Sequence, residues 1–190
     1  KKHKMFVLIK SNSEVILDES LSDYLEEKNY IGSSDWGKSK YWLFKNLTVH
    51  FKVIGDESKP PIVLIHGFGA SSDHWRYNAE AFANEGFRVY GIDLIGFGKS
   101  EQPHQSKLNH LDNNLWAAQL TSFIEEIVDV QRNGKVVLIA NSLGALTAMT
   151  TLSQRPELIK TIIAAPLPEP VCINPITLSS PDWFKKIKRF

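Results

Sequence analysis

The sequence has little cysteine, no excess of charge of one sign and no long apolar run. Each of these absences argues against a class of protein. Its single cysteine, Cys172, cannot form an internal disulfide, and neither C-x-x-C pairs nor zinc-ligand spacings occur. The 22 Lys and Arg residues nearly balance the 21 Asp and Glu residues, which gives no reason to expect nucleic acid as a partner. No apolar run approaches the roughly 18 residues of a membrane span.

The rest of the composition is typical of a folded globular domain. The chain has 190 residues, of which 43% are hydrophobic and 23% charged, and a chain of this length can bury about 70% of its unfolded surface. We therefore expect a core that needs neither a metal nor another cofactor, and the lone cysteine fits a cytoplasmic, reducing compartment. We divide the chain into an N-terminal extension of uncertain structure, 1–40, a core, 41–170, and the start of a lid, 171–190.

Strand and helix patterns alternate from residue 41 onward. Four apolar runs without alternation are typical of parallel strands that helices cover on both faces, so the sequence predicts an α/β fold with a mostly parallel sheet. A pair of strands with a turn near Asn46 precedes them, and within 1–40 only a short strand at Val15–Leu17 and a short helix at Leu21–Tyr30 are expected. The expected strands are Trp42–Lys45, Val49–Ile54, Ile62–Ile65, Phe87–Ile92, Val136–Ala140 and Thr161–Ala165, and the helices are Asp73–Ala83, Asn113–Arg132 and Leu143–Gln154.

Three glycine-containing loops follow three of these strands: His66–Gly69, Asp93–Ser100 and Ala140–Gly144. Ligands of open parallel sheets bind beyond the carboxyl ends of the strands, so we expect the loops to meet in one site. Gly67 lets its loop turn tightly. We interpret His66 as a structural hydrogen-bonding residue and Asp93, at the start of its own loop, as a brace.

Ser142 lies between a buried strand and a helix, with a small residue two positions away on each side, Ala140 and Gly144. This pattern matches the nucleophile elbow G-x-S-x-G, with alanine in the first glycine position. The turn is so tight that strand and helix nearly touch at the flanking positions, which leaves the serine on a strained backbone. The N–H of Leu143 would then be one donor to an oxyanion and the N–H of Phe68 the second. The alternative interpretation of Ser142 is a helix N-cap.

In this order, the three motifs resemble the α/β-hydrolase fold family, over about Trp42–Pro170. In particular, the sequence is similar to lidded hydrolases of cyanobacteria and plastids that are related to enzymes de-esterifying pheophytin and chlorophyll. The resemblance implies Ser142 as nucleophile, the amides of Phe68 and Leu143 as the oxyanion hole, and a lid after the strand that ends near Ala165. It also implies a plastid or thylakoid-associated location as an alternative to the cytoplasm.

The sequence departs from the family pattern in its histidines. The family places an acid and then a histidine after the nucleophile, whereas all six histidines here precede Ser142. Without a base, a serine hydroxyl is a poor nucleophile. We expect a fragment truncated within its lid, with acid and histidine beyond residue 190. The alternative is a non-catalytic relative that acts as a binding protein.

The segment 181–190 places Trp183, Ile187 and Phe190 on one helical stripe, with its basic residues largely outside that stripe. Such a helix can pack over a pocket as part of a lid, or it can lie on a membrane surface. The sequence leaves both interpretations open.

A serine hydrolase that acts on the carboxylic ester of a small hydrophobic molecule, without a metal, is the function that these observations favour. A lyase or an acyltransferase stays open, because a fold does not fix its reaction. A nucleotide-binding module is a further alternative. It is disfavoured because Gly67-Phe-Gly69 and Gly96-Phe-Gly98 both lack the last glycine of the dinucleotide-binding fingerprint.

Overall fold

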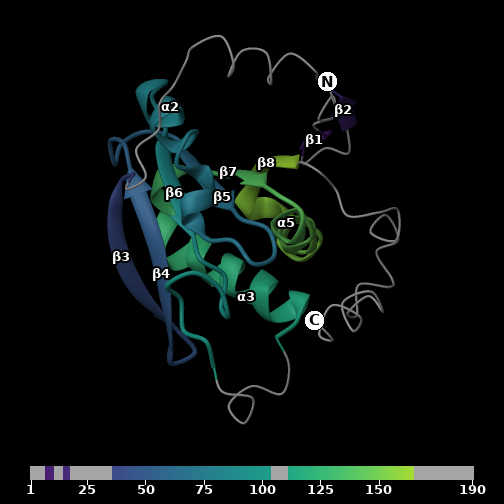
Figure 1. Cartoon of the computed structure of the whole chain (residues 1–190). Helices are drawn as coiled ribbons and strands as arrows, with labels where there is room; N and C mark the ends of the chain where they lie inside the picture. The colour runs from purple at the N-terminus through teal and green to yellow at the C-terminus, as the bar shows by residue number, and fades with distance from the viewer. Residues whose placement is uncertain (1–6, 11–14, 18–35, 104–110, 165–190) are drawn as a thin grey trace, which may run out of the picture.

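The computed structural model of the chain describes residues 7–10, 15–17, 36–103 and 111–164. Their strands form a sheet in the order β2-β1-β8-β7-β5-β6-β4-β3 (Figure 1). The strands are β1 (Val7–Lys10), β2 (Val15–Leu17), β3 (Lys38–Phe44), β4 (Leu47–Ile54), β5 (Pro61–Ile65), β6 (Arg88–Ile92), β7 (Val136–Ala140) and β8 (Ile159–Ala164). The helical segments are η1 (Ser72–Trp75), α2 (Ala79–Asn84), α3 (Asn113–Phe123), η2 (Ile124–Val128), α4 (Val130–Asn133), α5 (Leu143–Gln154) and η3 (Pro156–Leu158).

The four central strands, β8, β7, β5 and β6, are mutually parallel, which confirms the predicted α/β fold class. β5 is buried along its whole length, as expected for a strand that is covered on both faces. Because these strands run in one direction, the residues that follow β5, β6 and β7 all leave the sheet at the same edge. The loops that begin at His66, Asp93 and Asn141 are therefore brought together.

The predicted strand pair is a β-hairpin at one end of the sheet. β3 and β4 pair antiparallel from Lys38 opposite Val53 to Phe44 opposite Leu47. The two residues of the turn, Lys45 and Asn46, both have positive φ, 49° and 63°, as a type I′ turn requires. β4 pairs antiparallel with β6 and so joins the hairpin to the parallel strands.

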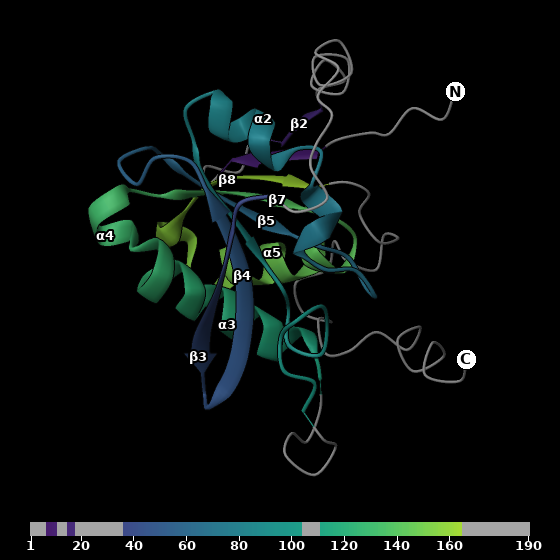
Figure 2. The ribbon, with the colours of Figure 1, turned by 60° about the vertical axis from the view of Figure 1, so that its left-hand side comes forward.

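Helices cover both faces of the sheet, as predicted (Figures 1 and 2). α3 and α5 pack against each other on one face, over a large apolar cluster that includes Phe51, Trp116 and Leu138. α2 and η1 lie on the other face, where a smaller cluster contains Trp36 and Trp75. The sheet thus separates two cores, and the larger one lies beneath the helix that follows Ser142.

Two predicted helices are interrupted in the structure. Instead of a continuous helix over Asp73–Ala83, a 3-10 turn capped by the Ser71 side chain is followed by a separate short helix, α2. Instead of a single helix over Asn113–Arg132, α3 passes into the π-helical turn η2 and stops at Asp129, whose φ is 54°. In a continuous helix the Val128 carbonyl would accept from the Arg132 N–H. Here the Asn133 side chain donates to it at 2.7 Å, and the Arg132 N–H donates to the Asp129 carbonyl.

Two short strands from the segment 1–40 extend the other end of the sheet. β1 pairs antiparallel with β8, and β2, the strand predicted at Val15–Leu17, pairs with β1. The helix predicted at Leu21–Tyr30, the lid predicted to begin in 171–190 and the amphipathic stretch 181–190 lie outside the described residues. Within the described ranges, every helix is too short or too polar to cross a membrane.

Candidate functional site

Ser142 lies at the tight turn between β7 and α5, at the carboxyl edge of the parallel strands. Its φ is 50° and its ψ is −112°, a region of backbone conformation that serine adopts only when its surroundings hold it there. Ser142 occupies the N-cap position of α5, as the alternative interpretation expects, but its side chain makes no capping hydrogen bond, so capping does not explain why a serine stands here. The residue is half-buried.

Gly144 explains why the turn must carry a very small residue two positions after the serine. A Cβ atom there would lie 2.6 Å from the carbonyl oxygens of both Ile65 and His66, well inside normal van der Waals separation. α5 therefore starts in direct contact with the end of β5. The position two residues before the serine is Ala140, which is buried and pairs with Ala164 of β8.

The loop that follows β5 runs alongside this turn. A Cβ atom on Gly67 would lie 2.8 Å from the Asn141 side-chain oxygen and 3.3 Å from the Ser142 Cβ. Any larger residue at this position would therefore crowd the Ser142 turn. The next residue, Phe68, exposes 51% of its surface, and its ring packs edge-on against Phe97 at 5.3 Å between centroids.

His66 is fully buried and joins two of the loops. Its Nδ1 donates to the Gly67 carbonyl at 2.7 Å, and its Nε2 accepts from the Leu94 N–H at 3.1 Å. This pair of contacts requires the neutral ring. Burial lowers the pKa of His66, although the Gly67 carbonyl and the Asp93 carboxylate favour its protonated form. Both ring nitrogens are engaged within the loops, so neither is available to take a proton from Ser142 in this geometry.

Asp93, also buried, holds together segments that are distant in the sequence. Its carboxylate accepts from the His50 ring at 2.9 Å, from the Ser72 N–H at 2.5 Å and from the Lys99 N–H at 2.8 Å. Burial alone would raise the pKa of the Asp93 carboxyl, but these hydrogen bonds outweigh burial and hold the pKa below its ordinary value. Gly98 is required beside it, since a Cβ there would overlap the carboxylate.

Sequence reasoning missed the buried side chains of α3 that fix the loop after β6. Gln119 is fully buried and accepts from the Ile95 N–H at 3.0 Å, while its amide donates to the Asp93 carbonyl at 3.1 Å. The Trp116 indole donates to the Ile95 carbonyl. The feature of the sequence that could have revealed this role is the position of Gln119, an amide side chain on the apolar stripe of a helix. A polar group that is buried there must find a hydrogen-bond partner.

No group of three or more His, Cys, Asp or Glu side chains in the described parts of the chain is arranged to hold a metal ion. The roles predicted for Ser142, Phe68 and Leu143 stay predictions on this geometry. What the structure brings together is a strained serine, the first amide of α5, the loop containing Gly67, and two buried supports, His66 and Asp93.

Comparison with known proteins gives a family for this arrangement. The sequence model of the family described as alpha/beta hydrolase fold matches residues 60–188. A mouse protein named epoxide hydrolase 4 is 30% identical over 152 residues, which span 76% of this chain and 40% of that protein. A rice protein named probable 1-acylglycerol-3-phosphate O-acyltransferase is 30% identical over 173 residues, 87% of this chain and 39% of that protein.

Solved structures share the fold. The thioesterase domain from the curacin biosynthetic pathway superimposes with a TM-score of 0.59 at 26% identity, over 66% of this chain and 42% of that domain. The chain thus spans about 40% of the length of the two curated relatives named above.

Proposed function

Because this chain belongs to the α/β hydrolase fold family, we propose that it carries the nucleophile and the oxyanion hole of a serine hydrolase for carboxylic esters. The observation that carries the proposal is the conformation of Ser142. A non-glycine residue held at positive φ on a turn between a strand and a helix is strained. In a nucleophile elbow, a turn of this kind directs the serine side chain away from the sheet, where a substrate can reach it.

The oxyanion hole is proposed from two backbone amides. Leu143 is the first residue of α5, so its N–H has no partner within the helix, and the helix dipole favours negative charge beside it. The close approach of Gly67 to Ser142 supports Phe68, the next residue of that loop, as the source of the second N–H. Two such donors stabilise the oxygen that becomes negative when a carbonyl is attacked, each worth about 10²–10³ in rate.

The proposed reaction has two steps. The Ser142 oxygen adds to the ester carbonyl as a base takes its proton, and the tetrahedral oxyanion collapses to an acyl-serine and an alcohol that receives a proton. Water then adds to the acyl-serine, and the acid is released as the serine regains its proton.

We do not assign the general base that would take the Ser142 proton to any histidine that the structure describes. The His66 ring is engaged at both nitrogens, and the His50 ring bridges the Asp93 carboxylate and the Ser39 hydroxyl. All six histidines precede Ser142 in the sequence. The 190 residues are therefore proposed to bind and position an ester without efficient proton transfer from the serine.

We propose an ester and not an epoxide as the substrate on chemical grounds, although one relative is named an epoxide hydrolase. Ring opening of an epoxide by a serine oxygen would leave an ether, which has no carbonyl for water to attack. An ester leaves an acyl-serine, which does. A nucleophilic serine beside two amide donors is consistent with a carbonyl substrate, as acted on by the thioesterase whose fold is shared.

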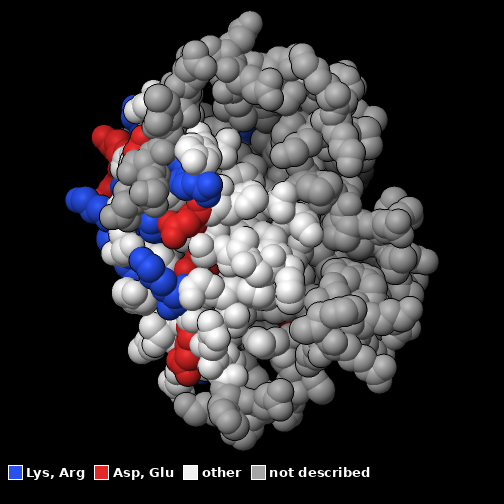
Figure 3. Space-filling view, in the orientation of Figure 1, with Lys and Arg blue, Asp and Glu red and all other residues white. Residues whose placement is uncertain are grey.

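A hydrophobic substrate is supported by the surface beside Ser142. The exposed ring of Phe68 packs on Phe97, which in turn packs on Trp116. α5 carries no charged residue, and its described surface is uncharged in the space-filling view, where Lys, Arg, Asp and Glu gather on the other side (Figure 3).

Acyl transfer to an alcohol is the second candidate function, favoured by the acyltransferase name of the rice relative. It shares the first step, because an alcohol in place of water would attack the same acyl-serine. Incubating the chain with an ester in the presence of glycerol and analysing products separates the two, since hydrolysis gives free acid and transfer gives a new ester.

A direct test is Ser142-dependent release of nitrophenol from a short-chain nitrophenyl ester, with and without added imidazole as an external base. We expect no turnover above the Ser142→Ala variant without imidazole, and a Ser142-dependent increase with it. Ser153→Ala, on the same helix, is the matched control and should behave as the parent chain. Robust Ser142-dependent hydrolysis without imidazole would contradict the assignment of the base, and no difference between parent and Ser142→Ala under either condition would contradict the nucleophile.

A further inference from the structure

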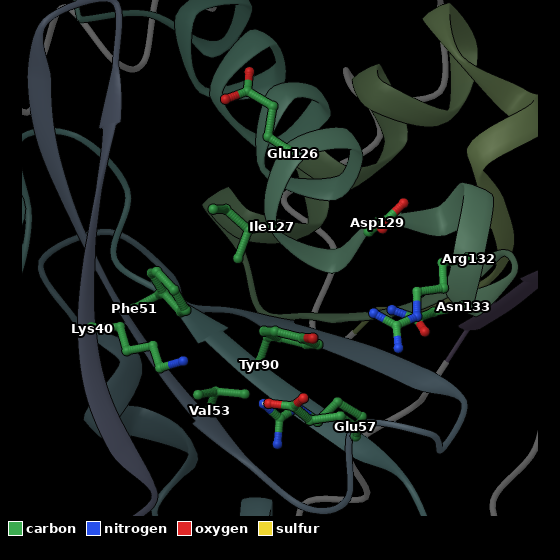
Figure 4. A pocket seen from close by; sticks show the side chains of 11 residues that line it. Lys40, Phe51, Val53, Glu57, Tyr90, Glu126, Ile127, Asp129, Arg132 and Asn133 are labelled. Carbon is green, nitrogen blue, oxygen red and sulfur yellow. The ribbon is translucent and has the colours of Figure 1, made fainter.

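A cavity lies at the amino edge of the parallel strands, opposite to the edge that carries Ser142. It has a volume of about 260 Å³ and lies between the β3–β4 hairpin, the start of β6, and the segment from η2 to α4 (Figure 4). Arg88, the first residue of β6, and Asn133, at the end of α4, both line it. The cavity is therefore separate from the proposed ester site by the length of β6.

The floor of this cavity is apolar. Phe51 and Val53 of β4 and Tyr90 of β6 line it, and each exposes no more than 6% of its surface. Ile127 of η2 lines the cavity from the helical side. A ligand that fills the cavity would thus place a hydrocarbon or aromatic group against these side chains.

Two cations point into the cavity from opposite sides. In Figure 4, the Lys40 ammonium and the Arg132 guanidinium are directed toward Tyr90. Neither side chain forms an ion pair or hydrogen bond within the part of the chain that the structure describes. Two positive charges that face the same space and have no acidic partner favour an anion between them.

The acidic residues of the lining do not neutralise these two cations. Glu57 pairs with Arg88 at 3.3 Å, and Glu126 accepts a hydrogen bond from the Trp42 indole at 2.9 Å. The carboxylates of Glu126 and Asp129 point away from Tyr90 (Figure 4). The lining as a whole carries three basic and three acidic side chains, and Lys40 and Arg132 are the basic ones among them that lack an acidic partner in the described part of the chain.

The interruption of the predicted long helix creates this arrangement. The left-handed conformation of Asp129 turns the chain so that α4 departs from the axis of α3. Arg132 and Asn133 then face the sheet, and the Asn133 amide is held by the Val128 carbonyl at 2.7 Å. π-helical turns such as η2 are frequent at functional sites.

We propose that this cavity, the Tyr90 cavity, binds a small amphipathic carboxylate. The carboxylate would lie between Lys40 and Arg132, with the guanidinium offering two parallel donors. The apolar part of the ligand would pack on Phe51, Val53 and Tyr90. Since the cavity is slightly smaller than the usual range for ligand sites, the ligand is of the size of a short fatty acid or a benzoate.

Titration of the ¹⁵N-labelled 190-residue chain with hexanoate, followed by amide chemical shifts, tests the proposal. We expect saturable shifts that cluster at residues around the Tyr90 cavity. Arg132→Gln and Lys40→Gln should each weaken hexanoate binding about tenfold or more, as expected for a lost hydrogen bond to a charged group. Circular dichroism and the parent-like spectrum of each variant verify that it is folded.

Lys135→Gln is the matched control, because it removes the same charge from an exposed residue three positions beyond Arg132 that does not line the cavity. It should bind hexanoate as the parent does. An equal loss in this control, or the absence of saturable shifts around Tyr90, would overturn the proposal. Inorganic phosphate should bind more weakly than hexanoate, and equal binding of the two would overturn the contribution of the apolar floor.

Discussion

Two non-glycine residues that directly precede a helix have nearly the same positive φ. Different contacts hold each of them in this conformation. Ser142 has a φ of 50° at the start of α5, and Asp129 has a φ of 54° between η2 and α4. Around Ser142 the constraint comes from residues distant in the sequence, since Gly144 touches the end of β5 and Gly67 touches the turn itself. At Asp129 it comes from neighbours, chiefly the Asn133 side chain.

This difference explains what each conformation contributes. Contacts from another strand fix Ser142 relative to the loop after β5, so the strained residue and the proposed oxyanion donors keep a defined geometry. The local hydrogen bonds at Asp129 only redirect one helix. Aspartate also tolerates the left-handed region better than serine tolerates a φ of 50° with a ψ of −112°.

The largest effect is expected from removing the distant support, with Gly144→Ala. Helix propensity alone would make this change stabilising by about 1 kcal/mol. However, the new Cβ would lie 2.6 Å from two backbone carbonyl oxygens that cannot easily move. We expect a net loss of about 2–3 kcal/mol in the free energy of unfolding, measured by urea denaturation. An unchanged or increased stability would show that α5 does not start in contact with β5.

The second prediction concerns the pH dependence of the loops around Ser142. Burial lowers the pKa of His66 from 6.5 in the folded state, so the unfolded chain binds this proton at a higher pH than the folded chain does. The stabilisation from neutral His66 is fully present above about pH 6.5 and is lost as the pH falls below it, by up to about 1.4 kcal/mol per pH unit.

Urea denaturation between about pH 7.5 and pH 5.5 measures this loss. His66→Gln should reduce the slope. His74→Gln should change it much less, because His74 is exposed and its charge is the smallest of the causes that act on the pKa of His66. The depressed pKa of Asp93 affects stability only near and below its ordinary value of 3.8, outside this range. A slope that His66→Gln leaves unchanged would contradict the neutral, buried imidazole.

A third prediction compares the two strained residues directly. Glycine adopts positive φ without the steric penalty that a Cβ imposes. We therefore expect Ser142→Gly to raise the free energy of unfolding by about 1 kcal/mol, and Asp129→Gly to change it by less, because aspartate already tolerates its conformation. Thermal or urea unfolding of the two variants decides this, and destabilisation by Ser142→Gly would mean that the turn is not strained at the serine.

The last prediction removes the local support, with Asn133→Ala, whose effect should be well below that of Gly144→Ala. This change removes the hydrogen bond to the Val128 carbonyl and should lower the free energy of unfolding by about 1 kcal/mol. The backbone bonds from Arg132 and Asn133 to the Asp129 carbonyl remain. A loss as large as that of Gly144→Ala would remove the distinction between distant and local support.

The difference between the two turns also explains which parts of the structure the sequence predicted. The turn at Ser142 was predictable because its close contacts require small residues at fixed positions, and Gly144 and Ala140 occupy them. β7 and α5 were predicted with the bounds that the structure has, since an apolar strand and a helix around such a turn leave few alternatives.

The break at Asp129 was not predictable in this way. Ile124 and Val128 keep helical spacing and both are fully buried, so the apolar pattern continues across a point where the backbone changes course. The support of the loops by Gln119 and His50 also depends on pairings between distant segments, which spacing along the chain does not reveal. The Tyr90 cavity, which needs both the break and the hairpin, was not visible in the sequence for the same reason.

Covalent labelling of the chain with a fluorophosphonate in the presence of imidazole, mapped by peptide mass spectrometry, tests whether Ser142 is the nucleophile. We expect a single adduct on the peptide that contains Ser142, absent from Ser142→Ala and retained in Ser153→Ala. An adduct that persists in Ser142→Ala, or labelling spread over several serines at similar rates, would contradict the proposed nucleophile.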